Sequence, residues 1–262
     1  MLIVADNLQI TKGEIARAVR DLNPEPIRLL VERCAQSGAQ AIDINSGPLG
    51  KNAGEKMSFL VQTVQDVVAL PLIIDTANPE AMEAGLAVCK NRAVINGFSL
   101  EPMKLTRMLP LAARYDADII GYLLNADSSV PRDADQRLAI AVQLLDALEG
   151  EGIPKEKLIV DPVVVPISWD QGKFQAREVC NVLRLLPEVL GYPVRTIAGL
   201  SNLTSGPGPR NKQLLMERIF LSMLSAADLT MILMNIWHGD TVSVAKACTI
   251  LQDDDIFAWE TI

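Results

Sequence analysis

Asp and Asn residues follow the short apolar runs of this chain, and their carboxylate and amide groups could bind a ligand rich in N–H donors. Asp75, Asn96 and Asp161 each come directly after an isoleucine or valine. Similar polar residues close the runs at Asp43-Ile44-Asn45 and Gly199-Leu200-Ser201-Asn202. A carboxylate can accept two parallel N–H bonds from an amino-heterocycle, and an amide can donate and accept on one edge. Cations are scarce at these positions, so a neutral, flat ligand fits better than a phosphate.

The same residues also have a purely structural interpretation, since Asp and Asn after a strand are often helix caps or turn residues. One such residue does not distinguish the two roles, but a repeated pattern does. A helical stretch follows each polar group. In a barrel of parallel strands, the strand ends that lead into helices all lie at one mouth, where active sites are built. We therefore expect residues from Asp43 to Asn202 to form one polar ring around a pocket.

The apolar pattern predicts eight strand–helix pairs. The expected strands are Leu2–Ala5, Ala41–Ile44, Leu72–Ile74, Ala93–Ile95, Asp118–Leu123, Leu158–Val160, Arg195–Ala198 and Met231–Met234. The expected helices are Asn23–Gly38, Lys56–Val68, Asn78–Lys90, Glu101–Tyr115, Arg132–Glu149, Arg177–Leu190, Asn211–Ala227 and Thr241–Leu251. Strict alternation at this length favours an α/β TIM (β/α)8 barrel with a parallel closed sheet, in a single domain over residues 1–262. An open doubly wound sheet is the alternative.

The composition narrows the functional classes. The chain has 262 residues, 49% of them hydrophobic, and a formal net charge of −8. This charge argues against a nucleic-acid partner, which requires a basic face. No apolar stretch reaches membrane-spanning length, and the start of the chain lacks the basic region of a signal peptide. We expect a cytoplasmic protein without membrane contact, with buried, reduced thiols at Cys34, Cys89, Cys180 and Cys248.

A few other residues carry weaker expectations. His238 is the only histidine, and a packing or rim role is favoured because no carboxylate or cysteine lies at ligand spacing around it. Trp169, Trp237 and Trp259 are expected to pack against the fold, although Trp237 at a barrel mouth could contact a partner instead. The acidic run Asp253–Asp255 is expected to be a solvated helix end.

The order of the motifs carries a specific resemblance. Asp-Ile-Asn, Ile-Ile-Asp-Thr, Asn-Arg-Ala-Val-Ile-Asn, Asp-Pro and Gly-Leu-Ser-Asn occur in this order along nearly the whole chain. The chain thereby resembles the methyltetrahydrofolate:corrinoid protein methyltransferases. These belong to the pterin-binding barrels, with dihydropteroate synthase and the folate domain of cobalamin-dependent methionine synthase. The strongest pieces are Cys89–Asn96 and Gly199–Asn202, with Arg210 following.

The resemblance implies a role for each matching residue. It implies pterin hydrogen bonds from Asp75, Asn96 and Asp161, and a catalytic Asn202 beside N5, the atom that carries the methyl group. The pocket-lining positions match Gly199, Ser201 and Arg210. The resemblance further implies tetrahydrofolate or 5-methyltetrahydrofolate as substrate, a corrinoid protein as partner, and a homodimer.

We expect the chain itself to hold neither a corrinoid nor a metal ion. Residues 236–241 around His238 cannot form the cobalamin-binding signature Asp-x-His-x-x-Gly, so a corrinoid would arrive on another protein. One histidine and four dispersed cysteines do not provide zinc ligands at the usual spacing.

Two segments depart from the family pattern. The family often has Gly-Glu-Arg-Ile-Asn after its first strand, whereas this chain has Ala5-Asp6-Asn7-Leu8-Gln9. The stretch Leu203–Gln213 is rich in Gly and Pro. It is interpreted either as a modified partner-docking or lid segment or as an ordinary surface loop.

Two other functions compete with methyl transfer. Dihydropteroate synthase would have the same fold, but its pyrophosphate leaving group calls for clustered Lys or Arg at the mouth, where Arg210 is the only clear candidate. A non-catalytic folate-binding protein is the second alternative.

Overall fold

The computed structural model describes residues 1–9 and 13–252, in which eight parallel strands close into one barrel. Each strand pairs with its neighbours in sequence, and β1 closes the sheet by pairing with β8. The predicted TIM barrel is thereby confirmed. The strands are β1 Leu2–Gln9, β2 Ala41–Asn45, β3 Leu72–Asp75, β4 Ala93–Phe98, β5 Asp118–Tyr122, β6 Leu158–Asp161, β7 Arg195–Gly199 and β8 Met231–Met234.

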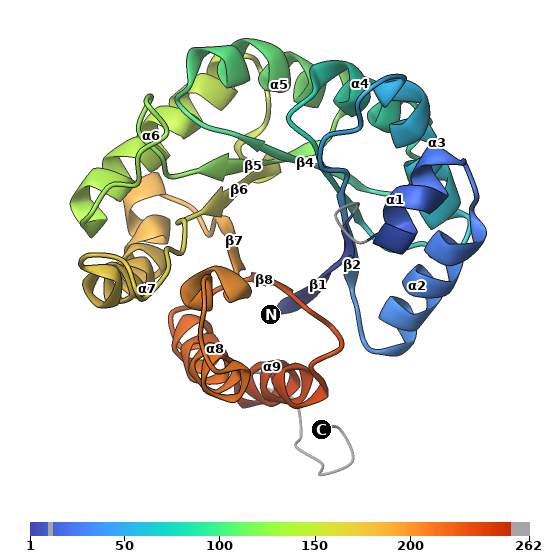
Figure 1. Cartoon of the computed structure of the whole chain (residues 1–262). Coiled ribbons are helices and arrows are strands. Elements are labelled where there is room, and N and C mark those ends of the chain that lie inside the picture. The colour runs from blue at the N-terminus through green and yellow to red at the C-terminus, as the bar shows by residue number, and fades with distance from the viewer. Residues whose placement is uncertain (10–12, 253–262) are drawn as a thin grey trace.

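The helices form a ring outside the barrel (Figure 1). Within the described residues they are α1 Gly13–Arg20, α2 Glu25–Gln36, α3 Ala53–Gln65, α4 Pro79–Val88, α5 Pro102–Tyr115, α6 Ala134–Gly150, α7 Gly172–Leu190, α8 Arg210–Ser225 and α9 Gly239–Gln252, with short 3-10 turns η1 Lys155–Lys157 and η2 Leu200–Thr204. Helix α4 starts as its sequence predicts, because the Asn78 side chain accepts hydrogen bonds from the N–H groups of Glu80 and Ala81.

Two apolar layers hold this architecture together. One side-chain set of every strand packs against the helices, and Ile42, Ile44, Ile74 and Ile95 in it are fully buried. The alternate set fills the barrel interior. Each buried aliphatic side chain contributes about 1.5–3 kcal/mol relative to exposure. Because alternation fixes the faces of a strand, it also fixes which polar residues point into the barrel.

The structure corrects several predicted boundaries. Strand β1 runs to Gln9 rather than Ala5, because Leu8 and Gln9 continue the pairing with β2 opposite Ile44 and Asn45. Helix α1 was not predicted; it is a short helix that buries Ile15, Ala18 and Val19. Strand β4 continues past Asn96 to Phe98, and α7 begins at Gly172, five residues before the predicted Arg177.

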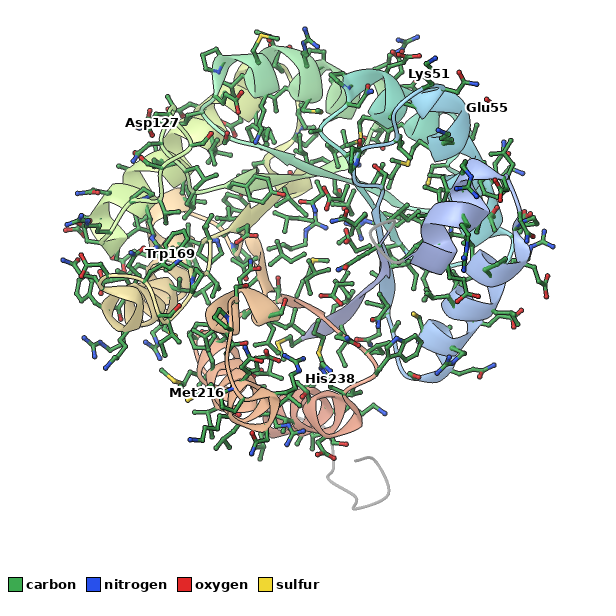
Figure 2. The ribbon with its side chains drawn as sticks, in the orientation of Figure 1. Lys51, Glu55, Asp127, Trp169, Met216 and His238 are labelled. Atoms are coloured by element: carbon green, nitrogen blue, oxygen red, sulfur yellow. The ribbon has the colours of Figure 1, made fainter. Side chains whose placement is uncertain are left out.

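Some predictions on individual residues were wrong. Trp169 is not a packing residue, since 57% of it is exposed; Figure 2 labels it beside α7. Cys34 and Cys180 are buried as expected, but Cys89 and Cys248 are only half-buried. The Asp253–Asp255 run and Trp259 lie outside the described residues. In the part of the chain that the structure describes, no helix has both the length and the apolar character needed to cross a membrane.

Candidate functional site

The inward-facing side chains change from apolar to polar at the carboxyl ends of the strands. Strands β3 to β7 each contribute one β-branched residue to the barrel interior, namely Ile73, Val94, Ile120, Ile159 and Ile197. Two positions further along the same strands stand Asp75, Asn96, Tyr122, Asp161 and Gly199. Since side chains two apart in a strand share a face, these residues also point into the barrel. The mouth therefore carries the polar ring that the sequence predicts.

The strand register places the first ring members side by side. Asn45, Asp75 and Asn96 are directly paired neighbours on β2, β3 and β4. The Asn45 amide donates to Asp75 Oδ2 at 2.6 Å. This hydrogen bond does not use the other carboxylate oxygen, Oδ1. Asp161 is the direct neighbour of Tyr122 on β5. The structure thus brings Asp75, Asn96 and Asp161 to one mouth.

Tyr122 is a ring member that the sequence reasoning missed. Its hydroxyl donates a short hydrogen bond to Asn96 Oδ1. Burial, together with the charges of Asp161, Asp75 and Asp43, raises the pKa of Tyr122 well above its usual value, so the phenol stays protonated and remains a donor. The available signal was its position two residues after Ile120 in a predicted strand. Gly97 lets β5 lie close to β4 at this point, because a Cβ there would be 2.4 Å from the Ile120 carbonyl oxygen and 3.0 Å from the Tyr122 ring.

A buried carboxyl group lies one layer below the ring. Asp43 on β2 is 2% exposed, and its Oδ1 has no hydrogen-bond partner among the described residues. Burial raises the pKa of Asp43 well above its usual value, and the nearby charges of Asp75 and Asp6 raise it further. The floor of the mouth is therefore rich in carboxyl groups, and the raised pKa of Asp43 favours its neutral, protonated form.

Burial also raises the pKa of two ring carboxyls. The pKa of Asp75 rises to about 6, and that of Asp161 rises to about 6 although the Val163 N–H and the Arg137 charge oppose the shift. Asp161 Oδ1 accepts the Val163 N–H at 2.8 Å. Both carboxyl groups therefore lose their protons as the pH rises through about 6. Above that pH, each is a carboxylate whose two oxygens can accept hydrogen bonds from N–H donors.

These shifts predict how stability depends on pH. When the pKa of a carboxyl group is higher in the folded chain than in the unfolded chain, its protonated form stabilises the fold. This stabilisation is lost as the pH rises through the pKa of the folded chain. Asp75→Asn removes the ionisation, so at pH 8 we expect it to raise the melting temperature of the ligand-free protein by about 2–6 °C. At pH 5 the gain should shrink. Thermal melts at both pH values measure this, with Asp170→Asn, at an exposed turn position, as control. An equal effect of Asp75→Asn at the two pH values would contradict the assignment.

Gly199, Ser201 and Asn202 come from the end of β7 and the η2 turn. Ser201 and Asn202 are exposed to the mouth side of the chain. The Asn202 amide lies over Gly199, because a Cβ on Gly199 would be 2.8 Å from Asn202 Nδ2. The absence of a side chain at Gly199 thus creates the space that the Asn202 amide occupies.

Arg210 belongs to a separate polar network beside this turn. Its guanidinium lies 3.4 Å from the buried Glu217 carboxylate and 3.2 Å from His238 Nε2. The Thr204 hydroxyl also donates to Glu217, at 2.5 Å. Burial and the Arg210 charge lower the pKa of His238, which keeps its imidazole neutral at pH 7. Figure 2 shows His238 near the ends of α8 and α9.

The Gly- and Pro-rich stretch from Leu203 to Gln213 is tied down by hydrogen bonds. The Gln213 amide donates to the carbonyl oxygens of Thr204 and Gly206, each at 3.0 Å. The Leu203 carbonyl accepts the Ile167 N–H at 2.8 Å. Helix α8 already begins at Arg210, so the segment without regular structure is shorter than predicted.

Several strand-associated cations gather at the other end of the barrel. Asp118, the first residue of β5, is buried and pairs with Arg92 at 2.7 Å and Arg195 at 2.8 Å, while Lys157 lies 3.9 Å away. These groups stand at the amino ends of the strands. They balance a buried charge far from the mouth and are not available to a ligand bound there.

A cavity of about 740 Å³ opens beside the ring. Asn45 and Asp75 line its inner part, and the loops after β2 and β3 line the remainder together with Arg107. Across residues 1–9 and 13–252, no group of three or more His, Cys, Asp or Glu side chains is arranged to hold a metal ion. The site can therefore position a flat, N–H-rich ligand by carboxylate and amide groups.

Comparison with known proteins identifies the family. The sequence profile described as "Pterin binding enzyme" matches residues 9–232. The chain belongs to the pterin binding enzyme family. This confirms the resemblance seen in the motifs, and the family's name agrees with a mouth that presents acceptors to a flat heterocycle.

Individual family relatives are distant in sequence. Methylcorrinoid:tetrahydrofolate methyltransferase of Eubacterium limosum is 23% identical over 232 residues, which cover 86% of this chain and 84% of that protein. Methionine synthase of Mycobacterium leprae (strain TN) is 24% identical over 203 residues, covering 74% of this chain but only 16% of that enzyme.

Solved structures of the same fold include two dihydropteroate synthases. The enzyme of Yersinia pestis superposes with a TM-score of 0.66 at 15% identity, covering 96% of this chain and 92% of the other. That of Xanthomonas albilineans, in complex with indole-2-carboxylic acid and 6-chloroguanine, gives 0.67 at 17% identity, covering 96% and 91%. At these identities the likeness establishes the pterin-binding barrel fold and does not select a reaction.

Proposed function

We propose that this family member transfers a methyl group between N5 of tetrahydrofolate and the cobalt of a corrinoid carried by a separate protein. The observation that carries the proposal is the mouth itself, where Asp75, Asn96 and Asp161 converge while Asp118 holds its cations at the opposite end. A pterin presents a flat edge of N–H donors to such acceptors. The relative named methylcorrinoid:tetrahydrofolate methyltransferase supports the choice of reaction.

In this proposal the three ring residues position the ligand and do not transfer protons. Charge-assisted hydrogen bonds from the pterin N–H groups to the carboxylates fix the orientation of the pterin, which supplies much of the advantage of an ordered site. Asn45 and Tyr122 keep Asp75 and Asn96 in place through the hydrogen bonds described above. Arg210 and Ser201 line the side of the pocket next to Asn202.

The proposed catalytic group is the Asn202 amide. A tertiary amine such as N5 is a poor leaving group, so positive charge on N5 must be handled while the N5–methyl bond breaks and the cobalt–methyl bond forms. The partner's corrinoid supplies the nucleophile in this direction and the methyl group in the reverse direction. An amide can donate to N5 or, after rotation, accept from N5–H, so one residue serves both directions. Oriented dipoles of this kind act where charge changes most.

The direct test is methyl transfer by the purified chain. Folate binding is measured first, by calorimetry with tetrahydrofolate and 5-methyltetrahydrofolate. Transfer is then followed by the visible absorption change of cobalamin or of a corrinoid protein, in both directions. Transfer that depends on the chain supports the proposal. Tight folate binding without transfer to any corrinoid acceptor would instead support a folate-binding protein.

Dihydropteroate synthase activity is the second candidate, because solved structures of that enzyme share the fold over 96% of this chain. Its reaction must stabilise a departing pyrophosphate. Two cations lie near the proposed site. Arg210 already contacts Glu217 and His238, and Arg107 lines the cavity beside Asp75, where it could meet an anionic group. A pyrophosphate-release assay with a pterin diphosphate and an aminobenzoate separates the two reactions.

The contact between Gly199 and Asn202 provides a specific test of the catalytic assignment. Gly199→Ala adds a methyl group 2.8 Å from Asn202 Nδ2 and must displace this amide. We expect kcat for methyl transfer to fall about three- to tenfold, equivalent to roughly 0.7–1.4 kcal/mol, with a smaller change in folate affinity. Stopped-flow transfer at saturating folate measures it. Gly150→Ala, where the added Cβ meets nothing within 4 Å, is the matched control; equal rates in the two variants would contradict the role of Asn202.

A further inference from the structure

Arg137 on α6 is a fully buried arginine that contacts two loops of the barrel mouth. Its exposed fraction is 0%. Nε donates to the Pro131 carbonyl at 3.0 Å, in the loop before α6. Nη1 donates to the carbonyls of Pro162 at 2.7 Å and Val163 at 3.3 Å, in the loop after β6. Nη2 donates to Gln175 Oε1 on α7 at 3.1 Å. Burying such a charge is costly, so these bonds need an explanation beyond packing.

The turn that Arg137 holds has an unfavourable backbone. Val163 has φ of +63°, in the left-handed region, where a β-branched residue is a true outlier. In this conformation the Val163 N–H points back and donates to Asp161 Oδ1 at 2.8 Å. The surrounding structure must compensate for the strain, and the two carbonyls adjacent to this turn are both bound by one guanidinium group.

Charged and titratable groups surround this pair on every side. Asp161 faces Tyr122 on β5 and the Arg137 charge on α6, with Asp75 and Asp43 inside the barrel. The guanidinium itself faces the carboxylates of Asp133 at the start of α6 and Glu178 on α7. The charge of Arg137 opposes the effect of burial on the Asp161 pKa.

We propose that Arg137 is a positioning residue, which holds the strained Val163 turn so that Asp161 Oδ1 is occupied by the turn and Oδ2 remains directed at the ligand. The ligand side of this inference rests on the proposed folate function. The effect of Arg137 on the turn and on the protonation of Asp161 is independent of that function and can be measured in the ligand-free protein.

The first experiment follows Asp161 without ligand. Its carboxyl carbon is titrated by NMR in the wild-type chain, in Arg137→Lys and in Arg137→Gln. Wild type should titrate with a pKa of about 6. Arg137→Lys keeps the charge and should leave this value nearly unchanged, whereas Arg137→Gln removes the charge and should raise it. The same pKa in all three proteins would overturn an electrostatic link between the two residues.

The second experiment measures folate affinity. Arg137→Lys replaces three donor nitrogens by one, which cannot bind the carbonyls of the Val163 turn while also binding Pro131 and Gln175. We therefore expect an affinity about three- to tenfold lower with kcat at saturating folate nearly unchanged. Adding Val163→Gly should recover most of the loss, because glycine adopts a positive φ without strain. A merely structural arginine would show no such rescue. Wild-type affinity in Arg137→Lys, or no recovery in the double variant, would overturn the proposal.

A variant that leaves Arg137 intact guards against misfolding of the arginine variants. Val163→Pro cannot adopt a positive φ and has no N–H for Asp161. It should raise the Asp161 pKa and weaken folate binding at least tenfold; normal values of both would count against the turn. If wild type binds no folate, the proposed function fails, while the Asp161 titrations of these variants still decide whether Arg137 and the turn control this carboxyl.

Discussion

Replacing Asp161 by alanine is expected to weaken folate binding by roughly 1.5–3 kcal/mol, or about one to two powers of ten in affinity. Asp161 points into the mouth from the end of β6, and one of its oxygens is already satisfied by the Val163 N–H. The other oxygen is the proposed acceptor for the pterin edge. The loss should decrease as pH falls through about 6, because protonation of the wild-type carboxyl removes the same interaction.

Calorimetric titration with 5-methyltetrahydrofolate at pH 8 and pH 5 measures this effect. Asp127→Ala is the matched control, since Asp127 is an exposed loop residue labelled at the outer edge of the molecule in Figure 2. It should bind folate as wild type does. The fold of Asp161→Ala should survive, as the side chain lies at the mouth. Unchanged folate affinity in a folded Asp161→Ala protein would refute the assignment.

Replacing Asn202 by alanine is expected to slow methyl transfer by more than about tenfold, or roughly 1.4 kcal/mol, with a smaller loss of folate affinity. A group that interacts mainly in the transition state lowers kcat and leaves ground-state binding less affected. Both directions of transfer should slow, because they share one transition state. Since Asn202 is exposed on the η2 turn, its loss should not disturb the core.

Stopped-flow transfer to cobalamin or the corrinoid partner, combined with equilibrium folate titration, measures the two quantities. Asn181→Ala, an exposed position on α7 away from the strand ends, is the matched control. If Asn202→Ala transfers methyl at a near-normal rate with saturating folate, Asn202 is not the N5 group. His238, a neutral imidazole beside Arg210, would then be the next candidate.

The barrel and the polar character of its mouth could be predicted from local sequence patterns. The reason is local: apolar runs of strand length alternate with helical segments, and the carboxyl ends of parallel strands must meet at one end. Asp75, Asn96 and Asp161 could therefore be assigned to one ring before any distance was known. The family resemblance was also contained in these motifs, and the match over residues 9–232 confirms it.

The contacts that support the ring could not be predicted in this way. Tyr122 could not be distinguished from other strand residues until the register placed its hydroxyl against Asn96. In the sequence, Arg137 is one polar residue of an amphipathic helix. In the structure it is fully buried and binds the carbonyl of Pro162, 25 residues further along the chain. The high pKa of Asp43 likewise arises from burial and from charges on other strands. Such contacts join distant segments, and desolvation depends on the whole fold, so local sequence patterns carry no record of them.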